Sequence, residues 1–202
     1  RNNFNSSEAK VIEAYSYALE QRQRYNASGG AEGAFVVATN ASWGVDEGQV
    51  ADAPIWCGFY DVLGEAGIIN CAATANDDID VEVFGDLPTA CPSDYLIAVT
   101  NTDHNDIKEV EAGYGAISID LGAPGTGAYN ITNGGAYGGF GGTSGATPHV
   151  AGTAALLYSL DCPALSALTQ ADPAAAALLI KEAILAGVDP NASLAGITTT
   201  GG

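Results

Sequence analysis

One segment constrains the fold of this chain more than any other: residues 141–152 read GGTSGATPHVAG. Glycines lead into Ser144, and an alanine-rich apolar run of helical length follows from Val150 to Leu160. This pattern predicts a sharp bend that enters a buried helix, with Ser144 in the first turn. Pro148 suits a first turn, because no intrahelical N–H bond is lost there. A helix start also offers free N–H groups and the positive end of the helix dipole.

Two interpretations of Ser144 follow from this position. A serine before an apolar helix usually caps it. Alternatively, its hydroxyl attacks a carbonyl while its own N–H helps to hold the resulting oxyanion. The segment is longer than a cap requires, and it resembles the nucleophile signature of the subtilisin-like proteases, G-T-S-x-A-x-P-H-x-A-G, at every fixed position. The resemblance implies a serine endopeptidase that hydrolyses peptide bonds through an acyl-enzyme on Ser144.

Short apolar runs alternate with helical segments along the chain, which predicts an α/β fold with a largely parallel sheet. The family resemblance implies a subtilisin-like three-layer fold, with helices on either side of a mostly parallel central sheet. The predicted helices, besides the one after Ser144, cover residues 6–25, 54–65 and 173–186. The predicted strands cover 34–41, 68–73, 95–100, 106–110 and 116–121, a hairpin covers 128–140, and 198–202 lie within or just before another strand.

A second piece of chemistry follows the predicted strand 68–73. Asn76 lies directly beyond this strand, and loops after parallel strands are where α/β proteins place their functional residues. A lone asparagine there is usually a turn residue, but its amide can also donate a hydrogen bond to an oxyanion. Residues 67–76, GIINCAATAN, resemble the subtilase segment in which a strand runs into A-A-G-N. The resemblance assigns Asn76 the oxyanion role, with Ala75 standing where glycine is usual.

The resemblance also implies a substrate groove for an extended polypeptide. Ser42, Trp43 and Gly44 resemble the segment whose backbone pairs with the substrate chain. The run that ends in Ala73, Thr74 and Ala75 resembles the opposite wall of the first specificity pocket. Small residues on both walls leave room for a peptide to lie as an added strand. Trp43 fits a substrate contact and a core position equally well.

A serine nucleophile needs a general base and a residue that orients the base, and the chain has only two histidines. His149 lies five residues beyond Ser144 on the same predicted helix, about 140° around it and ~7.5 Å along it, so it cannot accept the Ser144 proton. It matches the structural histidine of the motif. His104 lies in a polar loop, where the family has no catalytic residue; a different serine hydrolase would have to recruit it.

The family's catalytic Asp and His lie upstream of the oxyanion asparagine, and no match to them is found here. We therefore interpret residues 1–202 as the C-terminal part of a single subtilase catalytic domain, without its N-terminal strands and its His helix. The triad Asp and His are then expected on an upstream segment or on a partner chain. The alternative is a catalytically silent subtilase-like module used for binding or structure.

Charge and apolar patterning exclude some partner classes. The net charge is −18, from 24 acidic and 6 basic residues, which argues against nucleic acid and anionic membrane surfaces. No run approaches the ~20 apolar residues of a membrane span. A secreted, extracellular protein fits this composition.

Four cysteines lack C-x-x-C spacing, so a zinc site is not expected, and their even number in an acidic chain suggests secretion with one or two disulfides. Cys57 lies early in the predicted helix 54–65, and Cys91 lies in the loop that leaves the Asn76 strand, so we predict a Cys57–Cys91 disulfide. Cys71 lies in an apolar run that suits a buried free thiol. No cofactor is required by the mechanism, and we assign no metal ligands. The resemblance allows structural calcium at the acidic loop 77–86, which otherwise reads as solvated.

Overall fold

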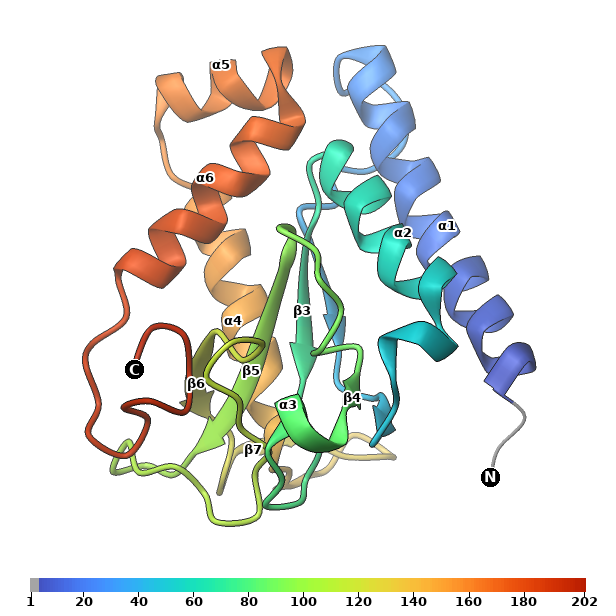
Figure 1. Ribbon diagram of the computed structural model, residues 1–202. Coiled ribbons are helices and arrows are strands. Elements are labelled where there is room, and N and C mark those ends of the chain that lie inside the picture. Colours follow the sequence, from blue (N-terminus) through green and yellow to red (C-terminus); the bar gives the residue numbers. More distant parts are fainter. Residues whose placement is uncertain (1–3) are drawn as a thin grey trace.

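The structure is a computed structural model that describes residues 4–202, and its central layer is a four-stranded sheet (Figure 1). All neighbouring strands are parallel, in the order β1-β3-β5-β6. The strands are β1 (Ala38–Ala41), β3 (Ile69–Ala73), β5 (Leu96–Thr102) and β6 (Leu121–Pro124). In register, Asn40 faces Cys71, Cys71 faces Ile97, and Val99 faces Leu121.

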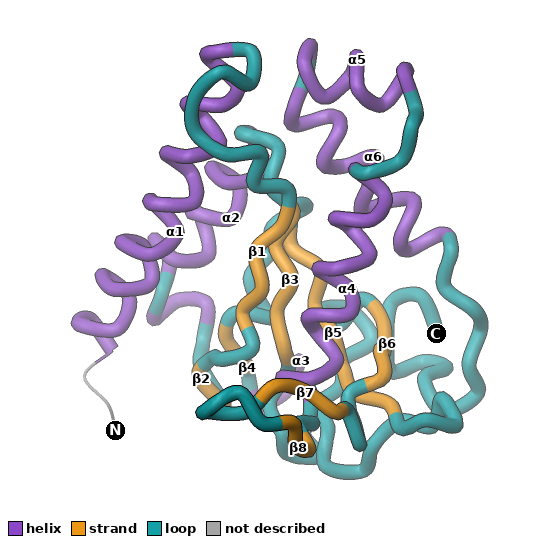
Figure 2. Tube along the Cα trace, turned by 180° about the vertical axis from the view of Figure 1, so that it is seen from behind, coloured by secondary structure: helices purple, strands orange, loops and turns teal. Residues whose placement is uncertain are grey.

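Helices cover both faces of this sheet, which confirms the predicted three-layer α/β fold (Figures 1 and 2). One face carries α1 (Phe4–Ser28) and α2 (Pro54–Glu65), and the other carries α4 (Thr143–Tyr158) and α6 (Pro173–Ala186). Side chains alternate between the two cores along each strand. Ile97 and Val99 pack with α4 and α6, whereas Leu96 packs with α1 and α2. A sheet buried on both faces explains why its strands are continuous apolar runs rather than alternating ones.

Smaller elements surround the edge of the sheet where the parallel strands end. These are β2 (Val45–Asp46), paired antiparallel with β4 (Asp86–Leu87), a 3-10 turn (Val50–Asp52) and α3 (Val81–Phe84). The helix α5 (Pro163–Ala171) instead follows α4 at the opposite end of the sheet (Figure 1). The predicted hairpin is confirmed as β7 (Tyr129–Ile131) and β8 (Tyr137–Gly139). Four short elements, β2, α3, β4 and α5, were not predicted, because they are stabilised by tertiary contacts and have no periodic apolar pattern in the sequence.

Two predicted strands are wrong. Residues 106–110 form no strand; their single ladder contact is an isolated bridge from Lys108 to Thr102. The prediction at 116–121 is displaced, since the strand begins only at Leu121, opposite Val99. Ile107, Val110 and Ile117, which suggested these strands, are exposed at 55%, 70% and 78%, whereas Ile119 is buried without belonging to a strand. The predicted first strand is also shorter, beginning at Ala38 rather than residue 34.

Residues 198–202 are assigned to no strand, but they lie beside β6. Thr199 and Thr200 donate backbone hydrogen bonds to the carbonyls of Ile119 and Asp120, and Gly122 donates to Gly202. The predicted strand position is therefore partly right: the backbone pairs along the segment leading into β6 without regular ladder geometry.

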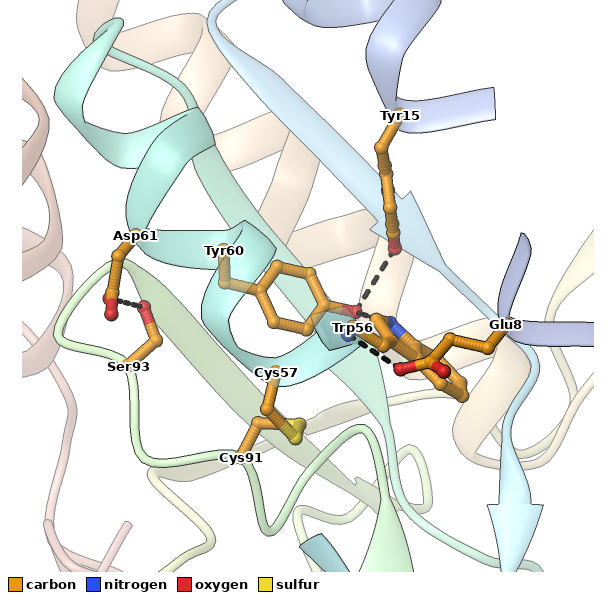
Figure 3. The surroundings of a disulfide bond; sticks show 8 residues. All are labelled: Glu8, Tyr15, Trp56, Cys57, Tyr60, Asp61, Cys91 and Ser93. Carbon is orange, nitrogen blue, oxygen red and sulfur yellow. Dashed lines mark hydrogen bonds between the residues drawn. A yellow bond between two sulfur atoms is a disulfide. The ribbon is translucent and has the colours of Figure 1, made fainter. Parts of the chain in front are cut away.

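A disulfide and a cluster of aromatic residues attach α1 and the loop before β5 to α2 (Figure 3). Cys57 and Cys91 are bonded, with their Cα atoms 5.0 Å apart, as predicted. The Trp56 indole donates to the Tyr60 hydroxyl at 3.0 Å, and Tyr15 of α1 lies 3.1 Å from the same oxygen. These buried contacts fix α2, whose C-terminal end leads into β3. Cys71 and Cys162 are free, and burial raises the pKa of the Cys71 thiol to about 12.

Among the described helices, none is long and apolar enough to cross a membrane by itself. Only α4 and α5 taken together meet the criterion by length and composition, and the chain bends by 103° between them.

Candidate active site

The N-terminus of α4 presents Ser144 at the edge of the sheet. The helix begins at Thr143, so Ser144 is its second residue, as the motif predicted, and it ends at Tyr158 rather than Leu160. Gly142 precedes the helix with φ of 70°, a backbone conformation that favours glycine. An added Cβ at Gly142 would also lie 2.4 Å from the Asn76 side-chain oxygen. The bend into the helix therefore needs glycine both for its backbone angle and for the approach of Asn76.

Pro148 occupies the second turn of α4, and our placement of it in the first turn is wrong. Because proline has no N–H, the carbonyl of Ser144, four residues earlier, loses its helical partner. The Ser42 hydroxyl replaces that partner and donates to the Ser144 carbonyl at 2.8 Å. In return, the Ser144 hydroxyl donates to the Ser42 carbonyl at 3.1 Å. This reciprocal pair joins the start of α4 to the segment that follows β1.

Asn76 is held at the same place by the residue before Ser144. Its side-chain oxygen accepts a hydrogen bond from the Thr143 N–H at 2.9 Å, and the Thr143 hydroxyl lies 3.1 Å from it. That hydroxyl lies closer still, at 2.6 Å, to the carbonyl of Thr74. A backbone N–H can only donate, so this contact identifies the Asn76 oxygen and leaves the amide nitrogen as a donor. Asn76 is exposed, and no acceptor contacts its nitrogen among the described residues.

The predicted site residues meet in one small pocket. Its cavity volume is about 50 Å³. The residues that line it are Trp43, Gly44, Asp46, Ala73, Thr74, Ala75, Asn76, Asp86 and Ser144. Of the predicted set, Ser42 alone is missing from this lining, and it contacts Ser144 through the hydrogen bonds above. The structure therefore brings the two predicted walls of the groove together at Ser144; the roles of these residues in substrate binding stay predictions.

Trp43 and Gly44 form their wall for different reasons. Trp43 is 46% exposed, and one face of its ring stacks on Trp56, with the ring centroids 5.4 Å apart. It thus combines both positions that the sequence left open, a core contact and a pocket wall. At Gly44, an added Cβ would lie 2.1 Å from the carbonyl oxygen of Leu87 in β4. Glycine is required there because the two chain segments pass so closely.

Asp86 is a pocket residue that the sequence analysis missed. It is 1% exposed, and its Oδ2 accepts hydrogen bonds from the Ala75 N–H at 3.2 Å and from the Thr89 hydroxyl at 2.5 Å. Burial raises the pKa of Asp86 to about 6, although both hydrogen bonds favour the ionised form. The available signal was the apolar surroundings of Asp86, which follows Val83 and Phe84 and precedes Leu87 and Pro88.

Two hydrogen-bond donors without a partner in the described chain belong to residues that line the Ser144 pocket. The Ser144 N–H lies in the first turn of α4, where no carbonyl four residues earlier belongs to the helix, and no partner accepts from it among the described residues. The Asn76 amide nitrogen is the second donor. Such a pair can stabilise negative charge that develops on a carbonyl oxygen during attack by Ser144.

Neither histidine contacts Ser144. His149 binds the Gly145 carbonyl through Nδ1 at 2.9 Å, and His104 lies in the exposed loop beside Asn105, at 3.3 Å. Both line a separate pocket of about 490 Å³ between the β7–β8 hairpin and α4, whose lining does not include Ser144. Within residues 4–202, the hydroxyl of Ser144 has only the Ser42 carbonyl as a partner, so the site lacks a general base in this part of the chain.

The acidic loop 77–86 is held by protein partners. Asp80 accepts the Glu82 N–H and caps α3, Glu82 accepts from the N–H groups of Ile117 and Ser118, and Asp78 pairs with Lys108 at 3.3 Å. In the described chain no group of three or more His, Cys, Asp or Glu side chains is placed to hold a metal ion. Structural calcium at this loop stays a prediction, whereas the interpretation of Asp86 as a solvated loop residue is wrong, because Asp86 is buried.

The model of the subtilase family matches residues 2–199. The alkaline serine protease ver112 of Corniculantispora psalliotae is 32% identical over 136 residues, which are 63% of this chain and 34% of that protein. Thermitase of Thermoactinomyces vulgaris is 48% identical over 63 residues, 31% of this chain and 22% of the relative.

Two solved structures share the fold. A cold adapted subtilisin-like serine proteinase matches with a TM-score of 0.56 at 25% identity, over 76% of this chain and 49% of that one. The prenylagaramide maturation protease PagA matches with a TM-score of 0.60 at 25% identity, over 85% of this chain and 57% of that one. The chain thus spans 34% of the length of the ver112 protease and about half of these two structures. With a family model matched along nearly all of its length, the chain belongs to the subtilase family.

Proposed function

We propose that this chain is the nucleophile-bearing part of a serine endopeptidase. Ser144 attacks the carbonyl of a polypeptide substrate and forms an acyl-enzyme that water then hydrolyses. The Ser144 N–H and the Asn76 amide hold the oxyanion, and the substrate lies between residues 42–44 and 73–75. Family membership supports serine protease activity in general. The observation that supports the assignment to these residues is the hydrogen bond from the Thr143 N–H to the Asn76 oxygen, which leaves the amide nitrogen free to donate in the pocket that Asn76 and Ser144 both line.

The triad Asp and His belong, in this proposal, to an upstream segment of the same protein or to a second chain. Two features of the described residues support a docking position for that segment. β1 is an edge strand of the parallel sheet, half-buried where β3 and β5 are fully buried. Leu156 of α4 and Leu160, just beyond the end of that helix, are exposed at 69% and 57%. An open strand edge and exposed apolar side chains are surfaces that a further strand and helix can cover.

An extracellular location fits this function. The net charge of −18 disfavours nucleic acid and anionic membranes as partners. The Cys57–Cys91 disulfide is typical of oxidising compartments.

The test is active-site labelling by a peptidyl fluorophosphonate, with and without the upstream segment. We expect slow labelling of the chain alone, because a serine hydroxyl without a base is a weak nucleophile, and fast labelling of Ser144 in the assembled protein, meaning this chain together with its upstream segment. Fast labelling of the chain alone that His104→Ala abolishes would show a different serine hydrolase.

A catalytically silent module is the alternative, favoured by the lack of a base near Ser144 in residues 4–202. It predicts that even the assembled protein resists labelling at Ser144 while it still binds peptides in the groove.

A further inference from the structure

Asp86 places a carboxylate in the pocket that holds Ser144. The side chain is 1% exposed and lines the same cavity as Ser144 and Asn76. It belongs to β4, whose antiparallel partner β2 directly follows Trp43 and Gly44 of the opposite wall. The pairing of these two short strands thus carries an acidic residue from a sequence-distant loop to the substrate groove.

The carboxylate is fixed on one side and open on the other. Oδ2 receives both protein hydrogen bonds, from the Ala75 N–H and the Thr89 hydroxyl, whereas Oδ1 has no donor among the described residues. Opposite Asp86 in the β2–β4 register lies Asp46, a second acid that lines the same pocket. The ion pairs found in residues 4–202 join Arg24 to Glu32 and Lys108 to Asp78, so neither acid of the pocket receives a basic partner there.

Thr74 gives an independent sign that the pocket is built for a polar ligand. It is 4% exposed and lines the cavity, yet its hydroxyl has no hydrogen-bond partner in the described structure. Buried polar groups in proteins are nearly always paired, so an unpaired hydroxyl beside a half-satisfied carboxylate indicates atoms that a ligand completes. An oxygen-lined pocket of negative charge, with one fixed carboxylate, suits a positively charged donor.

We propose that this pocket receives the side chain of a lysine or arginine from the substrate residue that immediately precedes the scissile bond. The inference rests on the proposed function, in which the carbonyl of that residue lies at Ser144. The ammonium or guanidinium group donates to Oδ1 of Asp86 and to the Thr74 hydroxyl, and it neutralises the repulsion between Asp86 and Asp46. An apolar side chain leaves the carboxylate desolvated and unpaired, which disfavours such substrates. Burial holds the pKa of Asp86 at about 6, so we expect the preference at pH 8 to fade near pH 5, where the carboxyl is protonated.

The first test compares matched peptide substrates with the assembled protein. The substrates differ only in the residue before the scissile bond: lysine against norleucine, and arginine against its neutral isostere citrulline. We expect kcat/KM to be on the order of 10- to 100-fold higher for the charged member of each pair at pH 8.

Asp86→Asn keeps a carbonyl oxygen that accepts from Ala75 and Thr89. In this variant we expect the charged and neutral substrates to react at equal rates. Asp52→Asn is the control at an exposed acid outside the pocket lining, and we expect the ratio to change by less than about twofold, since this charge is screened by solvent. Equal rates for lysine and norleucine in the unmutated protein would overturn the proposal, whatever the variants do.

The second test needs no catalysis. Calorimetric titration of this chain with butylguanidinium and with its neutral analogue butylurea measures the preference of the pocket directly. We expect tighter binding of the cation, lost in Asp86→Asn and at pH 5. Selective cation binding without any peptide hydrolysis would confirm the cation preference of the pocket but remove the proposed function, and with it the assignment of the pocket to the residue before the scissile bond. Hydrolysis without charge preference, together with equal binding of the two probes, would do the opposite.

Discussion

The loops that follow β3 and β5 leave the same edge of the parallel sheet, and each carries a candidate catalytic residue. The loop after β3 presents Asn76, which Thr143 binds at the start of α4. The loop after β5 presents His104, which is exposed. In that loop, Asp103 accepts the N–H groups of Asn105 and Ile107, so its polar groups satisfy one another locally. Both residues follow the carboxyl end of a parallel strand, where α/β proteins place their functional residues. Only Asn76 lines the same pocket as Ser144, however.

The difference lies in what holds each loop. The segment between β3 and β5 is tied to α4 by Thr143, to its own strand end by Asp86, and to α2 by the disulfide at Cys91. The loop after β5 also contacts that segment, since the Gly113 N–H donates a hydrogen bond to the Ala75 carbonyl at 3.0 Å. A strand end therefore brings a residue close to the site, and cross-links to the nucleophile helix decide whether it belongs there.

The largest expected effect comes from replacing Asn76 and His104, one at a time, by alanine in the assembled protein. We expect Asn76→Ala to lower kcat about 100- to 1000-fold with little change in KM, because the amide donates mainly to charge formed in the transition state; this range is the one known for an oxyanion asparagine in subtilisin itself. His104→Ala should stay within about twofold. Steady-state kinetics on one peptide substrate decides the matter. An effect confined to KM, or a large loss in His104→Ala, would reverse the assignment of the two loops.

The covalent tie of the β3–β5 segment should matter for stability. Removing the disulfide with Cys57→Ser and Cys91→Ser is expected to cost about 4 kcal/mol of unfolding free energy, since it frees a loop with a sequence separation of 34 in the unfolded chain. Urea denaturation followed by circular dichroism measures this cost. Cys162→Ser, at a free and only partly buried cysteine, controls for the exchange of sulfur for oxygen itself. An unchanged midpoint would mean that the segment is held by its hydrogen bonds alone.

Gly142 tests whether the position of Asn76 is set by backbone contact. Gly142→Ala forces a Cβ to within 2.4 Å of the Asn76 oxygen, so we expect Asn76 to shift and kcat to fall on the order of 10- to 100-fold. Gly127→Ala is a matched control, because its φ of 78° is similarly strained but nothing lies within 4 Å of the added atom. The control should lose about 1 kcal/mol of stability and keep its turnover. Similar kinetics in the two variants would show that strain, rather than contact with Asn76, governs the loss.

The nucleophile half of the site could be predicted from sequence because its determinants are local. Ser144, Gly142 and the apolar helix lie within one continuous segment, and Asn76 follows a buried apolar strand directly. Pro148 was assigned to the wrong turn, since the compensating donor, the Ser42 hydroxyl, lies 102 residues away in sequence. No local pattern carries that information.

Asp86 and the strands before β6 show the same limit. In sequence, Asp86 is one acid among several in a loop, and only the pairing of β2 with β4 reveals that it is buried. The residues from 106 to 120 contain β-branched side chains that suit strands. Strand pairing with β5, however, begins only at Leu121, opposite Val99. Tertiary pairing overrides local preference in both cases.

Asp86 also lets the comparison be tested through stability. Its pKa is raised from 3.8 to about 6 by burial, so the folded chain holds this proton more tightly than the unfolded chain does. The resulting stabilisation is fully present below pH 3.8 and is lost as the pH rises through about 6. The shift corresponds to about 3 kcal/mol at most.

Asp86→Asn removes this titration while keeping an acceptor oxygen, but the buried amide retains part of the desolvation cost. We therefore expect the variant to be about 1–2 kcal/mol more stable than the unmutated chain at pH 8 and to lose this advantage at pH 4. Urea unfolding at the two pH values measures the difference, with Asp103→Asn in the exposed β5 loop as the control. At Asp103, backbone hydrogen bonds lower the pKa, so that substitution should destabilise at pH 8 and have little effect at low pH. Suppose instead that the stability difference between Asp86→Asn and the unmutated chain is the same at pH 8 and pH 4. The ionised carboxylate of Asp86 would then carry no burial cost, and the loop after β3 would not hold a buried charge that the loop after β5 lacks.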